Sequence, residues 1–155
     1  MKEKVQRNLS TALWASTGVI LALLTLQGLS GNWITYFLVL PGGPAGLSQV
    51  FIGGLVSLAL YHRVTGFIIG FLSILVLILA FVRRWSNYVR LFAVLGFIIT
   101  ALAAMGGYLF VKSGFEDRWA LGQMSDAFVG AYAAYFLQLF FMNKTPTFRP
   151  ASKGS

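Results

Sequence analysis

The chain has 155 residues, of which 57% are hydrophobic and only 10% are charged. This composition is too apolar for a soluble domain of this size and is typical of an integral membrane protein. With no cysteine, one histidine and four acidic residues, the chain excludes thiol chemistry, iron–sulfur clusters and most hydrolytic sites. We therefore expect a single domain with no catalytic activity of its own. The net charge of +8 lies in short clusters between apolar segments, which predicts contact with anionic lipid headgroups and not with nucleic acid.

The first predicted helix covers residues 9–29 and follows a basic tail, residues 1–8. Its apolar run is longer than the hydrophobic region of a signal peptide, and no A-x-A pattern follows it, so we interpret it as a membrane helix. Residues 30–48 are rich in glycine and proline, which predicts a turn-rich connection.

The next apolar stretch runs from residue 47 to residue 82 and is longer than a bilayer requires. We predict a short interfacial or re-entrant piece over 49–59 and then a spanning helix over 61–82. The alternative is one helix with an interior kink at Gly53-Gly54.

Two more helices are predicted over residues 88–111 and 119–142, the first of them after a tight turn at residues 83–85. Residues 143–155 are polar and contain proline, which predicts a flexible tail. The predicted fold is all-α: an integral membrane four-helix bundle over residues 9–142.

Basic residues alternate between the predicted connections. One side holds nine of them: Lys2, Lys4, Arg7, Arg83, Arg84, Arg90, Lys144, Arg149 and Lys153. The other side holds three: Arg63, Lys112 and Arg118. The positive-inside rule then predicts a multi-pass protein of the cell membrane with both termini in the cytoplasm.

Polar residues gather in the outer third of the predicted spans, whereas the inner halves are almost wholly aliphatic and aromatic. The outer group consists of Gln27, Asn32, Arg63, Thr65, Arg118, Gln123, Ser125 and Asp126. Polar groups are costly inside a bilayer and usually mark a site, so this group predicts a cavity at that depth.

The only histidine, His62, opens a stripe at helical spacing that continues through Gly66, Gly70 and Ser73. Small residues beneath an imidazole leave room for a flat ligated group, or for a second helix that packs closely. Both interpretations remain open from the residues alone.

A haem is one such flat group, because imidazole and thioether form one of the axial pairs that bind haem iron. Met124 is the candidate second ligand and Met105 competes with it. Arg63 and Arg118 are placed to pair with the propionates, and Gln27 belongs to the same polar group. The face of the fourth helix toward the cofactor is expected to carry Ala120, Met124, Ala127, Ala131 and Tyr135.

Asp126 points away from Met124 on the same helix. Its two interpretations are a salt bridge to Arg63 or Arg118, and a proton relay or quinone contact.

The segments Leu26-Gln-Gly-Leu-Ser-Gly-Asn32 and His62-Arg-Val-Thr-Gly66 resemble small prokaryotic four-helix membrane proteins of cytochrome-b character, which are similar to one half of haem A synthase. The resemblance covers most of residues 9–142. It implies a haem b protein that transfers electrons near the outer face, as a subunit of a quinone-linked respiratory complex. It also implies histidines early in the second and fourth helices, and the second of these positions is Met124 here. That departure implies either His/Met ligation or the loss of haem. The alternative function is a cofactor-free accessory subunit of a larger complex with other membrane subunits.

Overall fold

The computed structural model of the protein describes residues 2–39, 49–82, 85–114 and 116–144. These residues form four helices and no strand, which confirms the all-helical prediction for this part of the chain. The helices are α1 (Lys2–Val39), α2 (Gln49–Val82), α3 (Asn87–Lys112) and α4 (Arg118–Lys144). Three of them contain stretches long and apolar enough to cross a membrane, namely Lys4–Gly31, Leu60–Val82 and Asn87–Lys112. The protein is therefore of the membrane class, although α4 is less apolar than a typical span.

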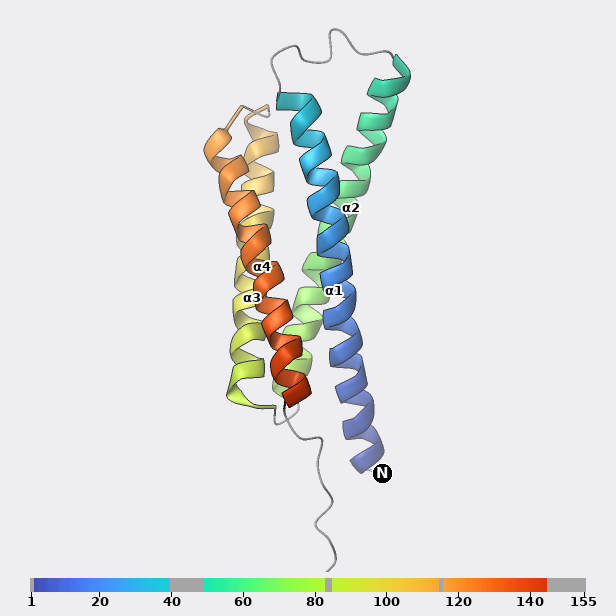
Figure 1. Cartoon of the computed structure of the whole chain (residues 1–155), viewed down its shortest axis with the longest axis vertical. Helices are drawn as coiled ribbons and strands as arrows, with labels where there is room; N and C mark the ends of the chain where they lie inside the picture. The colour runs from blue at the N-terminus through green and yellow to red at the C-terminus, as the bar shows by residue number, and fades with distance from the viewer. Residues whose placement is uncertain (1, 40–48, 83–84, 115, 145–155) are drawn as a thin grey trace, which may run out of the picture.

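The helices lie side by side, and successive helices run in opposite directions (Figure 1). We call the end at which α1 ends and α2 begins the upper end, and the opposite end the lower end. α1 packs against α2 and α4, and α3 packs against the same two helices. α2 and α4 therefore occupy diagonal positions and run in the same direction.

α1 is longer at both ends than the sequence predicted. Lys2 already belongs to the helix, so most of the expected tail over residues 1–8 is helical. The helix also continues through residues 30–39, which were expected to begin the turn-rich connection; residues 40–48 lie outside the described part of the chain. Gly31 lies inside this helix as a contact residue, since a Cβ atom there would lie 3.0 Å from Cε1 of His62 in α2.

α2 is one helix of 34 residues, so the predicted division into residues 49–59 and 61–82 is wrong. Gly53 and Gly54 each weaken a helix by only about 1 kcal/mol relative to alanine. That cost is too small to end a helix that is apolar for most of its length.

The predictions for α3 and α4 are confirmed to within two residues at every end. The Ser86 hydroxyl accepts a hydrogen bond from the Val89 N–H at 3.4 Å and caps the start of α3. Gly114 follows the end of α3 with φ of +70°, a conformation that favours glycine. Asp117 Oδ1 accepts from the Ala120 N–H at 3.0 Å and caps the start of α4. Local side-chain chemistry thus sets these ends.

The contact between α3 and α4 is close because glycine and alanine line it. Four residues of the predicted face of α4 are buried, namely Ala120, Ala127, Ala131 and Tyr135. The Ala120 carbonyl oxygen and the Tyr135 ring of this face approach glycines of α3. A Cβ atom on Gly106 would lie 3.0 Å from the Ala120 carbonyl oxygen. This packing of small residues is the kind that holds helices together in membranes.

The interior is not purely apolar toward the lower end. The buried polar side chains there are Thr17, Ser73, Thr100, Tyr135 and Gln138. They come from all four helices. The Tyr135 hydroxyl faces the hydroxyl groups of Thr100 and Ser73 without forming a hydrogen bond with either. Neither end of the Gln138 amide has a hydrogen-bond partner among the described residues.

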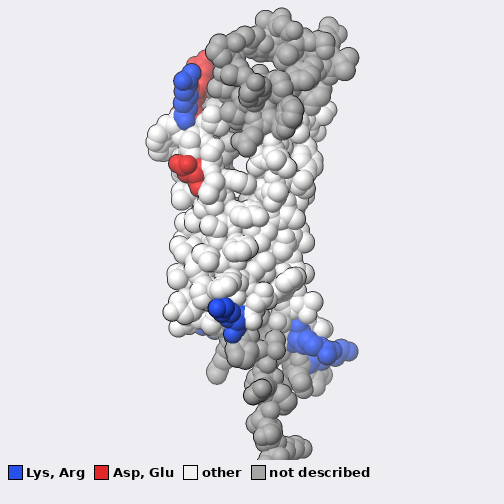
Figure 2. Space-filling model, in the orientation of Figure 1, with Lys and Arg blue, Asp and Glu red and all other residues white. Residues whose placement is uncertain are grey.

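Large apolar side chains cover much of the outer surface. In the three candidate spans, between 22% and 28% of the residues in the most apolar window are buried. Figure 2 shows a long uncharged stretch with charged side chains mainly toward its two ends. Such a surface suits contact with a lipid bilayer.

Candidate functional site

The only histidine lies in a group of polar side chains between α1 and α2, which we call the His62 cluster (Gln27, Ser30, His62 and Thr65). The Ser30 hydroxyl lies 2.9 Å from Nδ1 of His62 and donates to the Gln27 carbonyl oxygen at 3.1 Å. If the hydroxyl hydrogen is used in that second bond, the hydroxyl accepts from Nδ1–H of the imidazole. That tautomer places the lone pair of the ring on Nε2.

Thr65 completes the His62 cluster from α2. Its hydroxyl contacts Oε1 of Gln27 and also lies 2.9 Å from the Tyr61 carbonyl oxygen. Ser30 and Thr65 are both buried, with 5% and 4% of their surfaces exposed. The cluster therefore joins α1 to α2 through direct side-chain hydrogen bonds.

Of the two glycines in the stripe of α2, Gly66 and Gly70, only Gly66 contributes to the contact with α1. A Cβ atom on Gly66 would lie 3.3 Å from Nε2 of Gln27, so the small residue admits the glutamine side chain. A Cβ atom on Gly70 would meet nothing within 4 Å. Close helix packing, one of the two interpretations left open above, thus accounts for Gly66 but not for Gly70.

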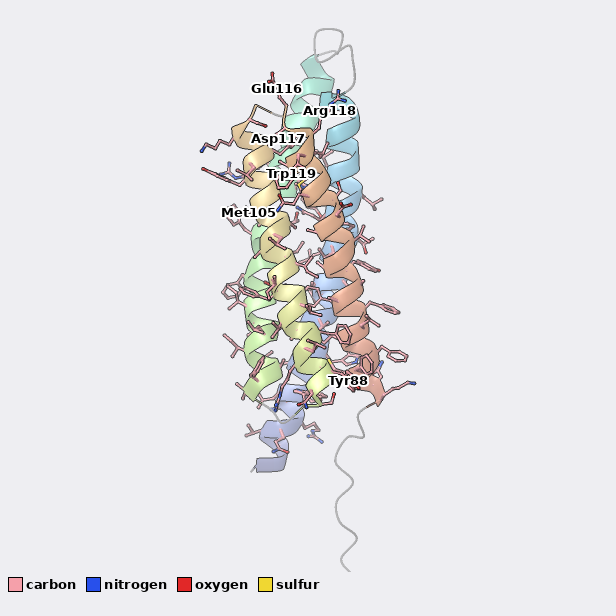
Figure 3. The ribbon with its side chains drawn as sticks, turned by 90° about the vertical axis from the view of Figure 1, so that its left-hand side faces the viewer. Tyr88, Met105, Glu116, Asp117, Arg118 and Trp119 are labelled. Atoms are coloured by element: carbon pink, nitrogen blue, oxygen red, sulfur yellow. The ribbon has the colours of Figure 1, made fainter. Side chains whose placement is uncertain are left out.

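The two predicted haem ligands lie against different helices. The imidazole of His62 lies against Gly31 of α1, whereas Sδ of Met124 lies 3.3 Å from the Cβ position of Gly107 in α3. Met105, the competing ligand, is 48% exposed on α3 (Figure 3). The structure therefore groups Gln27 with His62, and it gives both methionines separate neighbours.

The predicted arginines are both exposed, Arg63 on α2 and Arg118 at the start of α4. Arg118 and the adjacent Trp119 line an open groove of about 560 Å³ along α3 and α4, close to Asp117 (Figure 3). Gln123 and Asp126 line the same groove farther down. Asp126 is exposed and forms no ion pair within the described residues, so the predicted salt bridge to either arginine is not found there.

Sequence reasoning missed Ser30, which orients the imidazole. A signal was available, because Gln27, Ser30 and Gly31 follow one another at helical spacing and face the stripe that begins at His62. The serine and glycine were interpreted as the start of a connection, so that spacing was not extended past residue 29.

Comparison of the chain with protein-family models, with curated proteins and with solved structures found no match. Its function is therefore inferred from the geometry of its own residues. Two features could take part in binding or chemistry. One is the imidazole of His62 within the hydrogen-bonded contact of α1 with α2, and the other is the groove that exposes the Asp126 carboxylate and the Arg118 guanidinium.

Proposed function

We propose that the protein is an accessory subunit that helps to build a larger assembly of membrane proteins. The observation that carries this proposal is the His62 cluster. Its imidazole, hydroxyl and amide groups bond to one another across the contact between α1 and α2. Hydrogen bonds of this kind hold helices together in membranes, so these groups support assembly of the chain itself.

The outer surface is consistent with such a role. Each candidate span buries few of its residues within the chain, so most side chains are available to lipid or to neighbouring subunits. Four packed helices with large apolar outer faces could fill a space between the other subunits of a larger membrane complex.

The membrane topology forms part of the same proposal: four spans, with α4 as the last, and both termini in the cytoplasm. The nine-to-three distribution of basic residues supports this orientation. Reporter domains fused after residue 40 and after Ser113 should then both report the outer side, while a fusion at the carboxyl terminus reports the cytoplasm. A cytoplasmic signal from either of the first two fusions would contradict the orientation.

A second candidate function is that of a haem b protein in a quinone-linked respiratory complex. The observation in its favour is the Ser30–His62 hydrogen bond, because metal-binding histidines commonly donate their other ring N–H to a protein oxygen. His62 would bind the iron through Nε2, and Met124 remains the predicted second ligand. Arg63 and Arg118 would pair with the propionates. When bound, the haem would supply one-electron transfer.

One experiment separates the two functions. The tagged full chain is purified from its native membranes in a mild detergent, and its protein composition and absorption spectra are recorded in oxidised and reduced states. We expect other membrane proteins in a fixed ratio to the chain and no Soret band.

The His62→Ala variant provides the control. It removes one hydrogen bond between helices, which costs about 1 kcal/mol, so the variant should insert and purify normally. A Soret band in the wild-type protein that disappears in His62→Ala would overturn the accessory function and establish the haem protein.

A further inference from the structure

Two opposite charges stand on the outer surface of the chain away from its ends. Arg63 lies in α2, three residues after the start of the candidate span Leu60–Val82, and Asp126 lies in α4, eight residues after the start of that helix. Both side chains are exposed, and neither forms an ion pair within the described part of the chain. An unpaired carboxylate such as Asp126 is costly in a bilayer, whereas the long side chain of Arg63 can reach the headgroup region or a partner charge.

The contacts of α1 place the two charges at the same level. The Cβ position of Gly31 lies 3.0 Å from Cε1 of His62, and that of Gly28 lies 2.6 Å from Cζ of Phe128. Since these glycines are three residues apart, His62 stands about one helical turn above Phe128. α2 and α4 run in the same direction, so Arg63 is level with Asp126. The approach of Tyr135 to Ser73 gives the same alignment to within one residue.

The two charges nevertheless lie on helices that are not neighbours. α2 and α4 are diagonal, because each packs against α1 and α3. The exposed face of α2 therefore points away from that of α4 (Figure 1). The chain cannot pair these charges internally, but it presents complementary charges at one depth on two outer faces.

Both faces expose side chains at the levels just below the two charges. Below Arg63, α2 exposes Phe67 and Phe71, with 71% and 70% of their surfaces accessible. Below Asp126, α4 exposes Val129 and Ala133 at the corresponding levels. In a contact between α2 of one copy and α4 of another, these residues would lie at matching levels.

We propose that copies of this chain associate in the membrane through unlike faces, with α2 of one copy against α4 of the next and Arg63 paired with Asp126 across the contact. The inference rests on the proposed membrane assembly role and names a second copy as one partner. It also bears on α4, which is not among the helices apolar enough to span a membrane and which exposes Asp126: protein instead of lipid covers that charge. A contact between unlike faces repeats from copy to copy and closes into a ring or extends into a row.

Cysteine cross-linking tests the contact, and the chain is suited to it because it contains no cysteine. Two differently tagged copies of the full chain, one carrying Phe67→Cys and the other Val129→Cys, are expressed together and oxidised in native membranes. We expect a disulfide between the unlike copies. Leu26→Cys, at the same level on the exposed face of α1, is the matched control and should cross-link at least tenfold less with either partner. Cross-linking no stronger than this control, or only between like copies, would overturn the proposal.

Charge reversal tests the ion pair in the same membranes. Asp126→Arg introduced into both tagged copies should reduce the Phe67→Cys to Val129→Cys disulfide at least tenfold, and adding Arg63→Asp should restore it. A disulfide that is unaffected by Asp126→Arg would overturn the pairing. A loss of the disulfide that Arg63→Asp does not restore would also overturn it, and this is the result expected if Asp126 binds a lipid headgroup.

The two proposals fail separately. Purification with other membrane proteins but without this cross-link would leave the accessory function standing and reject the contact between copies. The cross-link without any other membrane protein in the purified sample would reject the accessory function and support the contact between copies.

Discussion

Gly106→Val should separate α3 from α4 and produce the largest loss of stability of any single glycine substitution in the chain. A Cβ atom at this position would lie 3.0 Å from the Ala120 carbonyl oxygen and 3.0 Å from the Met124 backbone nitrogen. Both are backbone atoms of a helix, so neither can rotate out of the way. We expect the free energy of unfolding to fall by about 3 kcal/mol or more. Equilibrium unfolding of the purified protein in mixed micelles measures this change.

Gly70→Val is the matched control, because a Cβ atom on Gly70 would meet nothing within 4 Å. Its effect should stay within about 0.5 kcal/mol. Equal losses from the two variants would show that branched residues weaken these helices generally, and the close contact of α3 with α4 would then not explain the result.

Tyr135→Ala should be similarly damaging for the opposite reason, because it removes packing. Tyr135 is fully buried, and its Cε1 and Cζ atoms lie 2.7 Å from the Cβ position of Gly96, so the ring fills the space that this glycine leaves. Truncation should lower the free energy of unfolding by about 3–5 kcal/mol, as for other buried aromatic residues. The same unfolding assay applies.

Tyr135→Phe separates the ring from its hydroxyl. The hydroxyl is buried and has no hydrogen-bond partner among the described residues, so its removal should leave stability unchanged or raise it by about 1 kcal/mol. Gly96→Leu combined with Tyr135→Ala should recover part of the lost stability by refilling the space from α3. A Tyr135→Phe variant as unstable as Tyr135→Ala would mean that the hydroxyl, and not the ring, holds the helices together.

The fold was predictable where its signals are local. The ends of α3 and α4 follow from Ser86, Gly114 and Asp117, each of which acts on backbone groups a few residues away. The end of α1 was not predictable in the same way. Gly31 can end a helix or admit a neighbour, and the neighbour that decides between these roles is His62, which is distant in the sequence.

The same limit applies to the candidate site. Gln27, His62 and Thr65 were expected at one depth because each lies near the same end of its helix, and the structure joins them. The neighbour of Met124 depends on how α4 is rotated against α3, which the close approach at Gly106 sets. The spacing of residues along α4 does not determine that rotation. Gln138 was missed because a single amide in an apolar stretch gives no periodic signal.

Gln138 bears on how the chain moves. Its side chain is fully buried in α4 toward the lower end, and its amide has no partner among the described residues. A buried amide without a protein hydrogen-bond partner costs about 1–3 kcal/mol. Any conformation in which the lower ends of the helices part enough to hydrate the amide recovers that free energy. The closed conformation therefore lies nearer in free energy to an open one than it would with leucine at this position, and the lower end is where we expect the chain to open first.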